Sequence, residues 1–319
     1  MNEIFKFIPP SPLKTAVLFL VFNRLDTTKQ VFQAIRQAKP PRLYIAADGA
    51  RSNKDGEHEK VEAVRKYIIQ NIDWDCKIDT LFRDQNLGCK YAVSEAITWF
   101  FKNEERGIIL EDDCLPSQSF FWYCEELLVK YNDNETIYLV SSDSRGSEHF
   151  GMKEDYGFCK YPLIWGWASW ARVWNNYDTE LEDWPKQKRV LPASISSYKP
   201  TVMFWKEIFQ RMYDNQIDTW DYQLCYLTFK NRGKCIVPRV NLVSNIGFGV
   251  DATHTIDDKS KNANRKRYDI NIPLNHSPSL SSEKKINKYY DRNEFFSEFE
   301  PVISRIIDKF ARMIKLKLK

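Results

Sequence analysis

The 319-residue sequence lacks the cysteine pairs and the long apolar segments that would define several classes of protein. Its seven cysteines are an odd number, widely scattered, and none forms a C-x-x-C pair. This excludes a disulfide framework and a cysteine-based zinc site, and it favours reduced thiols in a cytoplasm. Residues 1–12 have no apolar core of a secretory signal, and the apolar run at 16–22 is far too short to cross a bilayer. We therefore expect a cytoplasmic protein.

An excess of one charge is also absent from most of the chain. The net charge is only +4, and residues 302–319 alone contribute +5, which leaves −1 for the rest. A nearly neutral body argues against broad nucleic-acid binding, which requires a basic face. The hydrophobic fraction of 43% and the charged fraction of 28% are those of a globular protein.

In the first half of the chain, short apolar runs alternate with segments of helical periodicity. The runs predict strands at 16–22, 43–47, 78–82 and 108–113. Apolar faces over 31–38, 61–69, 92–100 and 119–131 predict helices, the first of them capped by Thr27. This alternation is typical of a parallel, doubly wound α/β sheet.

The second half is richer in aromatic residues and less regular. We expect a strand at 137–141, helices near 202–214 and 220–231, and a strand near 234–237. The polar segment 257–282 predicts a loop or linker.

Three carboxylates, Glu111, Asp112 and Asp113, directly follow the apolar residues 108–110, and residues 114–116 are expected to turn the chain. Acids so close together repel one another unless a cation or polar ligand groups lie among them. Oxygen ligands of this kind suit Mg²⁺ or Mn²⁺, which can bridge the phosphates of a nucleotide. The alternative is a solvated loop after a strand.

Other polar residues follow the neighbouring predicted strands. Asn23 and Arg24 follow the first strand, Asp48 the second, and a turn beginning at Arg83 the third. A parallel sheet gathers such residues along one edge, where ligands bind. Asp48 either accepts a hydrogen bond from a base or ribose, or caps the turn before Gly49. Arg24 and Arg83 either meet phosphate or form surface ion pairs.

A series of short motifs follows the order found in one known enzyme family. Asp112-Asp113 resembles the metal-binding D-x-D element of glycosyltransferases with the GT-A fold, and the full acidic trio resembles that of the Golgi N-acetylglucosaminyltransferase I type family. Further resemblances to that family lie, in chain order, at residues 22–24, 165–167, 220–221, 234–239 and 246–249. Residues 245–249 and 251–255 also resemble bacterial sugar transferases encoded among polysaccharide genes.

This resemblance implies a fold and a domain organisation. The fold would be α/β, of GT-A (Rossmann-like) type, with a mostly parallel central sheet flanked by helices. One catalytic domain would span 14–275, with a nucleotide-sugar-binding half at 14–145 and an aromatic-rich acceptor half at 146–275. Residues 276–319 would form a linker and a C-terminal basic amphipathic helix.

The resemblance also implies an activity, that of a metal-dependent inverting glycosyltransferase. A sugar would pass from a nucleotide sugar, expected to be a UDP-sugar, to a hydroxyl of a glycan or lipid-linked saccharide in bacterial surface polysaccharide synthesis. Asp113 would bind Mn²⁺ or Mg²⁺, and Asp221 would be the base that takes the acceptor's proton. The donor would be bound by Asn23, Arg24, Asp48, Arg83, Glu111 and Asp112.

Two further groups have open alternatives. The resemblance implies that His254 would reach the metal or the diphosphate. The alternative is an ordinary loop histidine. Trp165, Gly166 and Trp167 form a wall for an acceptor sugar, or the tryptophans pack in the core. Gly166 between two tryptophans indicates a close approach of the backbone.

The basic tail, 302–319, has apolar residues at helical spacing with basic residues largely opposite. Such a helix either lies on an anionic membrane surface, with the protein peripheral on the inner face of the cytoplasmic membrane, or docks on the body.

Two other functions are weighed against the glycosyltransferase. A nucleotidyltransferase is disfavoured, because residues 23–26 after the first strand contain no glycine. The remaining alternative is a carbohydrate-binding or scaffold protein that has the fold without turnover.

Overall fold

Continuous apolar runs form the central strands of the protein. The computed structural model describes residues 7–248, 262–276 and 280–294. Four strands of the first half pair in parallel: β1 (Ala16–Val21), β2 (Arg42–Ala47), β3 (Lys77–Phe82) and β4 (Arg106–Glu111). Parallel strands covered on both faces bury every side chain, which explains why β1 and most of β2 and β4 are apolar without alternation. The four predicted strands are thus confirmed.

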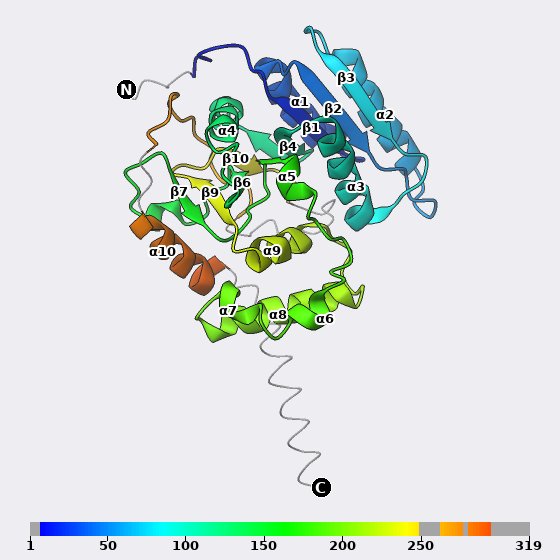
Figure 1. Cartoon of the computed structure of the whole chain (residues 1–319). Helices are drawn as coiled ribbons and strands as arrows, with labels where there is room; N and C mark the ends of the chain where they lie inside the picture. The colour runs from blue at the N-terminus through cyan, green and yellow to red at the C-terminus, as the bar shows by residue number, and fades with distance from the viewer. Residues whose placement is uncertain (1–6, 249–261, 277–279, 295–319) are drawn as a thin grey trace.

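Helices alternate with these strands as the periodicity predicts (Figure 1). They are α1 (Leu25–Ala38), α2 (Glu57–Asn71), α3 (Gly88–Asn103) and α4 (Ser119–Lys130). The start of α1 differs from the prediction. The helix begins at Leu25 after Arg24, and Thr27 lies in its first turn, where the hydroxyl donates to the carbonyl oxygen of Arg24 at 3.3 Å instead of capping the helix.

The second half extends the sheet with strands of both directions. These are β6 (Ile137–Ser141), β7 (Tyr156–Cys159), β8 (Trp167–Trp170) and β9 (Lys234–Pro238). The complete order is β3-β2-β1-β4-β8-β6-β9-β7, in which β8 and β7 run against the other six strands. The expected α/β fold with a mostly parallel central sheet flanked by helices is confirmed.

A small antiparallel ribbon lies apart from the main sheet. It pairs β5 (Cys114–Pro116) with β10 (Val243–Asn245). The expectation that residues 114–116 simply turn the chain is therefore wrong, because their backbone pairs with a strand more than a hundred residues away.

The helices of the second half are shorter, except for α8. They are α5 (Ala171–Trp174), α6 (Trp184–Gln187), α7 (Pro192–Ile195), α8 (Lys199–Tyr213), α9 (Asp221–Lys230) and α10 (Leu280–Tyr289). Short 3₁₀ and π segments occur at Ser147–His149 and Tyr290–Glu294. The helices expected near 202–214 and 220–231 are confirmed as α8 and α9.

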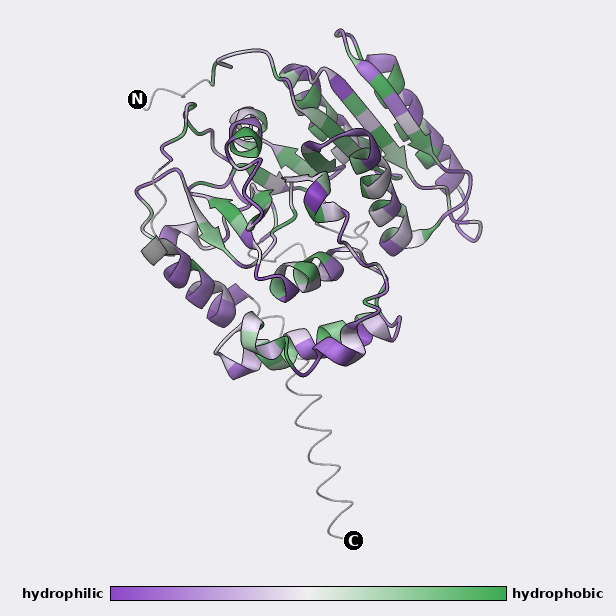
Figure 2. Ribbon diagram, in the orientation of Figure 1, coloured by the Kyte–Doolittle hydropathy of each residue, from purple (hydrophilic) through white to green (hydrophobic). Residues whose placement is uncertain are grey.

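Helix α10 was not predicted, and its first residues fall within the segment 257–282 expected to be a loop. Figure 2 shows why the pattern is weak, because most of α10 is hydrophilic. Ile286 is buried, whereas Lys284, Lys285 and Lys288 are exposed. The described part of the segment before it, 262–276, contains no helix or strand.

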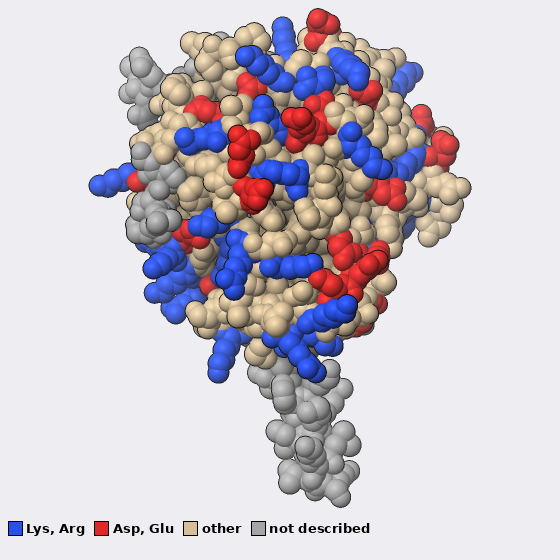
Figure 3. Space-filling view, in the orientation of Figure 1, with Lys and Arg blue, Asp and Glu red and all other residues tan. Residues whose placement is uncertain are grey.

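Much of the aromatic content of the second half fills the core. Trp167 stacks on Trp220 with ring centroids 5.8 Å apart, and Trp174 stacks on Tyr177 at 4.1 Å. All seven cysteines are free, as expected. On the face in Figure 3, basic and acidic side chains are interspersed, in keeping with the small net charge. Within the part of the chain that the structure describes, no helix is both long and apolar enough to cross a membrane. The basic tail, 302–319, lies outside that part.

Candidate functional site

The sheet reverses its strand order between β1 and β4. The chain moves outward from β1 to β2 and β3, then crosses back so that β4 pairs with the other side of β1. The carboxyl ends of strands diverge at such a switch point and leave a crevice for ligands. A pocket of about 570 Å³ lies there, lined by residues from the ends of β1, β2 and β4, the start of α3, Trp165 and residues 217–222.

Arg24 joins the polar residues after β1 to the acids after β4. Its guanidinium forms an ion pair with Asp112 and a second with Asp113, where Nη2 lies 3.0 Å from Oδ2. The backbone N–H of Phe22 also donates to Asp112, at 3.3 Å. Burial by itself lowers the pKa of the Arg24 guanidinium, but the two carboxylates outweigh this effect and raise it. Arg24 is therefore a fixed positive charge between two of the three acids.

Glu111 has a different environment from its two neighbours. Burial, then the charges of Asp113 and Asp112, raise the pKa of Glu111 to about 8, and Asp221 adds to the shift. Burial also raises the pKa of Asp112, and the positive charge of Arg24 opposes this shift. Burial and the neighbouring carboxylates thus disfavour the ionised form of Glu111.

Asp221, the first residue of α9, lines the same pocket as the acidic trio. Its carboxylate accepts a hydrogen bond from the Thr219 hydroxyl at 2.6 Å. The expected edge of the sheet thus brings the acids of β4 together with an acid from the distant second half of the chain. The geometry places two classes of carboxyl group, one of raised pKa and one on a helix N-terminus, around a single concavity.

Asp218 fixes the segment that carries Asp221. Its carboxylate accepts hydrogen bonds from the backbone N–H groups of Cys89 at 3.3 Å and Lys90 at 2.9 Å, which are free donors in the first turn of α3. Gly88 has a φ of +78°, and a β-carbon there would lie 2.9 Å from Oδ2 of Asp218. Sequence reasoning missed Asp218; the available signal was an acid three residues before Asp221.

Asp48 lines the pocket, but its carboxylate is engaged by the protein. It accepts hydrogen bonds from the N–H groups of Gly49 and Leu87, both at 3.0 Å, and Gly88 at 3.2 Å, and from the Asn86 amide at 2.9 Å. Burial raises its pKa, and these backbone donors oppose the shift. The hydrogen bond from Gly49 fits the alternative that Asp48 caps the turn before Gly49, and a role of Asp48 in donor binding stays a prediction.

Asn23 and Arg83 also have protein partners. The Asn23 amide donates to Glu57 at 3.0 Å, and Asn23 is not among the residues that line the pocket. Arg83 lines the pocket, donates to the carbonyl of Ala92 at 3.3 Å and pairs with Glu95 at 3.2 Å. The ion-pair alternative holds for Arg83 in this structure.

Of the three residues expected to form an acceptor wall, Trp165 alone lines the pocket. Its ring lies under the guanidinium of Arg145, 4.7 Å from the centroid, and meets Phe248 edge-on at 5.8 Å. Trp167 is only 1% exposed. A sugar has no face of the Trp167 ring to stack on, so its expected role at the acceptor wall is wrong and the core-packing alternative is correct.

Gly166 is confirmed as a point of close backbone approach. Its φ is +68°, and a β-carbon would lie 2.8 Å from a methyl group of Val243. Its carbonyl oxygen accepts a hydrogen bond from the Ser142 hydroxyl at 2.6 Å. The glycine is thus required by packing between β8 and β10, and it does not line the pocket.

A further charged group after β6 was missed by the sequence analysis. Arg145 pairs with the buried Asp143, Nε to Oδ2 at 2.6 Å, and Arg265 pairs with the same carboxylate at 3.0 Å. Because β6 runs parallel to β4, this group lies at the same edge of the sheet. The polar residues 142–145 directly follow the predicted strand 137–141, so the rule that found the acidic trio also applied here.

The acids supply hard oxygen donors of the kind that Mn²⁺ or Mg²⁺ prefers. Within the part of the chain that the structure describes, Oδ1 of Asp113 accepts only from the weak thiol donor of Cys114, at 3.4 Å. Among the described residues, however, no three His, Cys, Asp or Glu side chains form a metal-binding group. His254 lies outside those residues. The described donor set fits an ion bound through Asp113 and ligand oxygens.

Fold and site together define an α/β protein with an acidic pocket at the carboxyl edge of its sheet. No protein-family model matches the sequence, and no curated protein matches it.

Solved structures with a similar arrangement include a UDP-glucose pyrophosphorylase complexed with UDP-glucose (TM-score 0.35, 11% identity, 71% of this chain and 90% of that chain). Mouse xyloside xylosyltransferase 1 is similar at a TM-score of 0.33 and 9% identity, over 69% of this chain and 82% of that one. The glycosyltransferase GlyE of Streptococcus pneumoniae TIGR4 has a TM-score of 0.32 and 10% identity, over 70% of this chain and 45% of that one. Similarities this distant carry no argument about the site.

Proposed function

We propose that this protein is a metal-dependent inverting glycosyltransferase. It transfers a sugar from a UDP-sugar to a hydroxyl of a glycan or lipid-linked saccharide used in bacterial surface polysaccharide synthesis. One observation carries the proposal: Glu111, Asp112, Asp113 and Asp221 line the same pocket at the switch point of the sheet. Binding alone requires no such collection of acids. Sugar transfer requires a base for the acceptor's proton and carboxylates that hold a cation, because the cation compensates the negative charge of the leaving diphosphate.

The donor is proposed to occupy the part of the pocket near β1, β2 and β4. A volume of about 570 Å³ suits a small-molecule ligand. Arg24, which lines the pocket beside Asp112 and Asp113, is placed to bind the diphosphate by charge-assisted hydrogen bonds. Asp48 is proposed to act at the nucleoside end by fixing the loop at residues 86–88 through its hydrogen bonds.

Asp221 is proposed as the base. The hydrogen bond from Thr219 orients its carboxylate, which accepts the proton of the acceptor hydroxyl as that oxygen attacks the anomeric carbon. Trp165 is proposed to stack on the acceptor sugar, since its ring lies at the pocket and is supported by Arg145.

Asp113 is proposed to hold Mn²⁺ or Mg²⁺ through its less engaged oxygen, with the donor's phosphates as the other ligands. Such an ion, when bound, stabilises negative charge on the departing diphosphate. Its charge would also compensate Asp112 and Asp113, and Arg24 would then be free to pair with phosphate oxygens.

The alternative is a binding protein that has this fold without turnover. The ion pairs of Arg24 favour it, because they already compensate Asp112 and Asp113 without a metal. The two proposals differ in whether the acids act on a ligand, so they are separated by comparing binding with turnover.

Thermal unfolding with Mn²⁺ and a panel of nucleoside diphosphates tests donor binding. Saturation at about 100 times Kd stabilises by about 2.7 kcal/mol, which corresponds to about 5 °C in a domain of this size. We expect this shift with UDP plus Mn²⁺, its loss in Asp113→Ala, and its retention in the exposed control Asp26→Ala.

Release of UDP from UDP-sugars, with water as the acceptor, tests turnover. We expect Asp221→Asn to retain the thermal shift and to lower this release at least about 100-fold. A shift without any release by the wild type would favour the binding protein. No shift with any nucleotide would overturn both nucleotide-based readings.

A further inference from the structure

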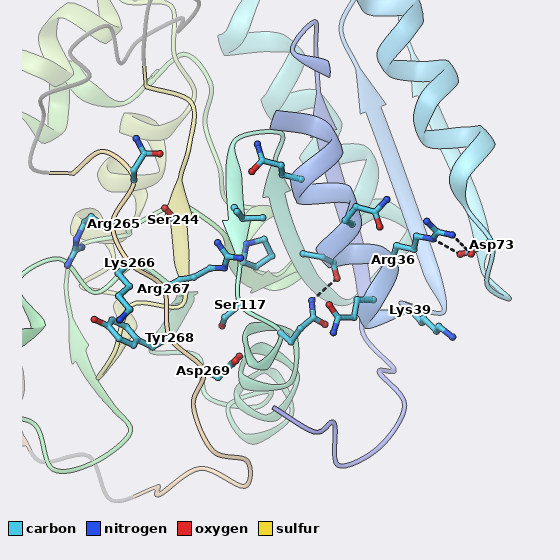
Figure 4. Close-up of a pocket in the computed structure, with 18 residues that line it drawn as sticks. Arg36, Lys39, Asp73, Ser117, Ser244, Arg265, Lys266, Arg267, Tyr268 and Asp269 are labelled. Atoms are coloured by element: carbon cyan, nitrogen blue, oxygen red, sulfur yellow. Dashed lines mark hydrogen bonds and ion pairs between the residues drawn. The ribbon is translucent and has the colours of Figure 1, made fainter. Parts of the chain in front are cut away.

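A second concavity lies on the side of the β5–β10 ribbon opposite to the acidic pocket. Ser244 lines this groove, whereas its neighbour Asn245 lines the acidic pocket. Successive residues of a strand point to opposite faces, so the ribbon forms a wall shared by the two concavities. The groove has a volume of about 980 Å³ and lies between α1, residues 115–118 and the segment 264–269 (Figure 4).

Basic side chains line the groove in excess of acidic ones. Two arginines are already paired: Arg36 binds Asp73, with Nε 2.8 Å from Oδ1, and Arg265 binds Asp143, with Nη1 3.0 Å from Oδ1. The other three basic residues, which have no ion pair with any described residue, are Lys39, Lys266 and Arg267. The groove therefore presents an excess of positive charge, five basic side chains against the two acids Asp73 and Asp269.

These three residues line the groove on opposite sides. Figure 4 shows Arg267 extending from the 264–269 segment into the groove, with Lys39 on the α1 side. Burial lowers the pKa of Arg267, and Asp269 opposes the shift. That aspartate is itself held by the backbone N–H of Ser119 at 2.9 Å. An anion in the groove would pair with Arg267, which forms no ion pair with any residue that the structure describes.

The rest of the lining suits sugar hydroxyls. Gln30, Gln33 and Gln37 lie on one face of α1, at spacings of three and four residues, and their exposed amides can both donate and accept hydrogen bonds. Tyr268 is 47% exposed in the same groove, with Lys266 Nζ 5.0 Å from its ring centroid. An exposed ring beside amides and cations offers stacking, hydrogen bonds and charge along an open groove.

We propose that this groove binds an anionic saccharide chain, whose sugars carry carboxylate or phosphate groups. Its charge is met by Lys39, Lys266 and Arg267, and its hydroxyls by the three glutamines. The site is separate from the acidic pocket and does not depend on the function proposed there.

Calorimetric titration of the full chain with tetragalacturonate, without nucleotide or metal, tests the proposal. Neutral maltotetraose is the uncharged probe of equal length, and inorganic phosphate is the anion without sugar. We expect tetragalacturonate to bind at least about tenfold more tightly than either, and to bind more weakly as ionic strength rises.

The variant Lys39→Gln/Arg267→Gln removes two charges from the groove. It is expected to weaken tetragalacturonate binding at least about tenfold, because each charge-assisted hydrogen bond contributes strongly. The control Lys54→Gln/Lys102→Gln removes two exposed charges that do not line the groove, and it is expected to change binding less than about twofold.

Arg267→Glu, which reverses the charge, is expected to abolish binding while it keeps the thermal unfolding temperature of the wild type. Equal binding of maltotetraose would overturn the role of charge. If phosphate binds as tightly as tetragalacturonate, the groove is only a site for small anions, and the proposal that it binds a saccharide chain is wrong. Equal losses in both double variants would place the binding outside the groove.

Discussion

Gly247 packs directly against the carboxylate of Asp113. A β-carbon at position 247 would overlap that carboxylate and would lie 2.7 Å from Nη1 of Arg24. The backbone holds the two segments together, since the N–H of Ile246 donates to the carbonyl of Asp113 at 2.9 Å. The segment after β10 thus fixes how the last acid of the trio sits, and it can do so only where residue 247 has no side chain.

Gly247→Ala is expected to displace the Asp113 carboxylate and its ion pair with Arg24. Overpacking of this kind costs about 1–3 kcal/mol of the free energy of unfolding, measured by urea titration. The stabilisation by UDP plus Mn²⁺ should be lost as well. The control is Gly56→Ala, where φ is +71° but no atom lies within 4 Å of the added carbon. It should lose stability by about 1 kcal/mol and retain the ligand response. An unchanged ligand response in Gly247→Ala would contradict the proposed role.

The strands and the edge that holds the site were predictable because they depend on local pattern. The apolar run of β1 and the run of β4 that precedes Glu111 are each buried, so hydrophobicity alone marked them as parallel strands. Polar residues after those strands were then expected to meet at one edge. The pocket at the β1–β4 switch point contains Arg24 and Glu111, as that reasoning requires.

The partners of those residues were not predictable, because they depend on contacts distant in sequence. The ion pair between Arg24 and Asp112 spans 88 residues, and the hydrogen bond from Lys90 to Asp218 spans 128. No local pattern reveals that Asp48 is engaged by the loop at 86–88. Trp167 also illustrates the limit, because a tryptophan at a sugar site and one in the core look alike in sequence.

Trp165 and Trp167 are expected to respond differently to truncation. Trp167→Ala should cost about 3–5 kcal/mol of the free energy of unfolding, because its buried ring stacks on Trp220. Trp165→Ala should cost only about 1–2 kcal/mol, because the ring is partly exposed at the pocket and contacts Arg145 on one face. Urea titrations of the two variants provide the measurement. Equal costs would show that Trp165 is also a core residue and would remove it from the proposed acceptor site.

Asp218 is expected to act as a positioning residue for Asp221. Asp218→Ala leaves the N–H groups of Cys89 and Lys90 without their acceptor, which should cost about 1–2 kcal/mol of stability. Release of UDP should fall about tenfold through kcat, with donor KM little changed, because the segment that carries the base loses its anchor. Asp218→Asn keeps an acceptor oxygen and should restore most of the rate. Asp214→Ala, an exposed acid just after α8, is the control. Failure of the asparagine variant to recover more activity than alanine would contradict a role through hydrogen bonding.

Glu57 is expected to make stability depend on acid pH. Hydrogen bonding from Arg51, despite the opposing effect of burial, lowers the pKa of Glu57, and Asn23 adds to the shift. A carboxyl whose pKa is lower in the folded state stabilises the protein above its ordinary value of about 4.3, and that contribution is lost as pH falls through the lowered value. Glu57→Gln should therefore cost about 1 kcal/mol at pH 7, a modest figure because Arg51 is partly exposed, and the gap from wild type should close as pH falls below about 4. Glu62→Gln, at an exposed carboxylate that pairs with Arg65, should show almost no difference from wild type at any pH. If the stability difference between wild type and Glu57→Gln stayed constant down to about pH 3, the charge of Glu57 would not be what holds Arg51 and Asn23 to α2.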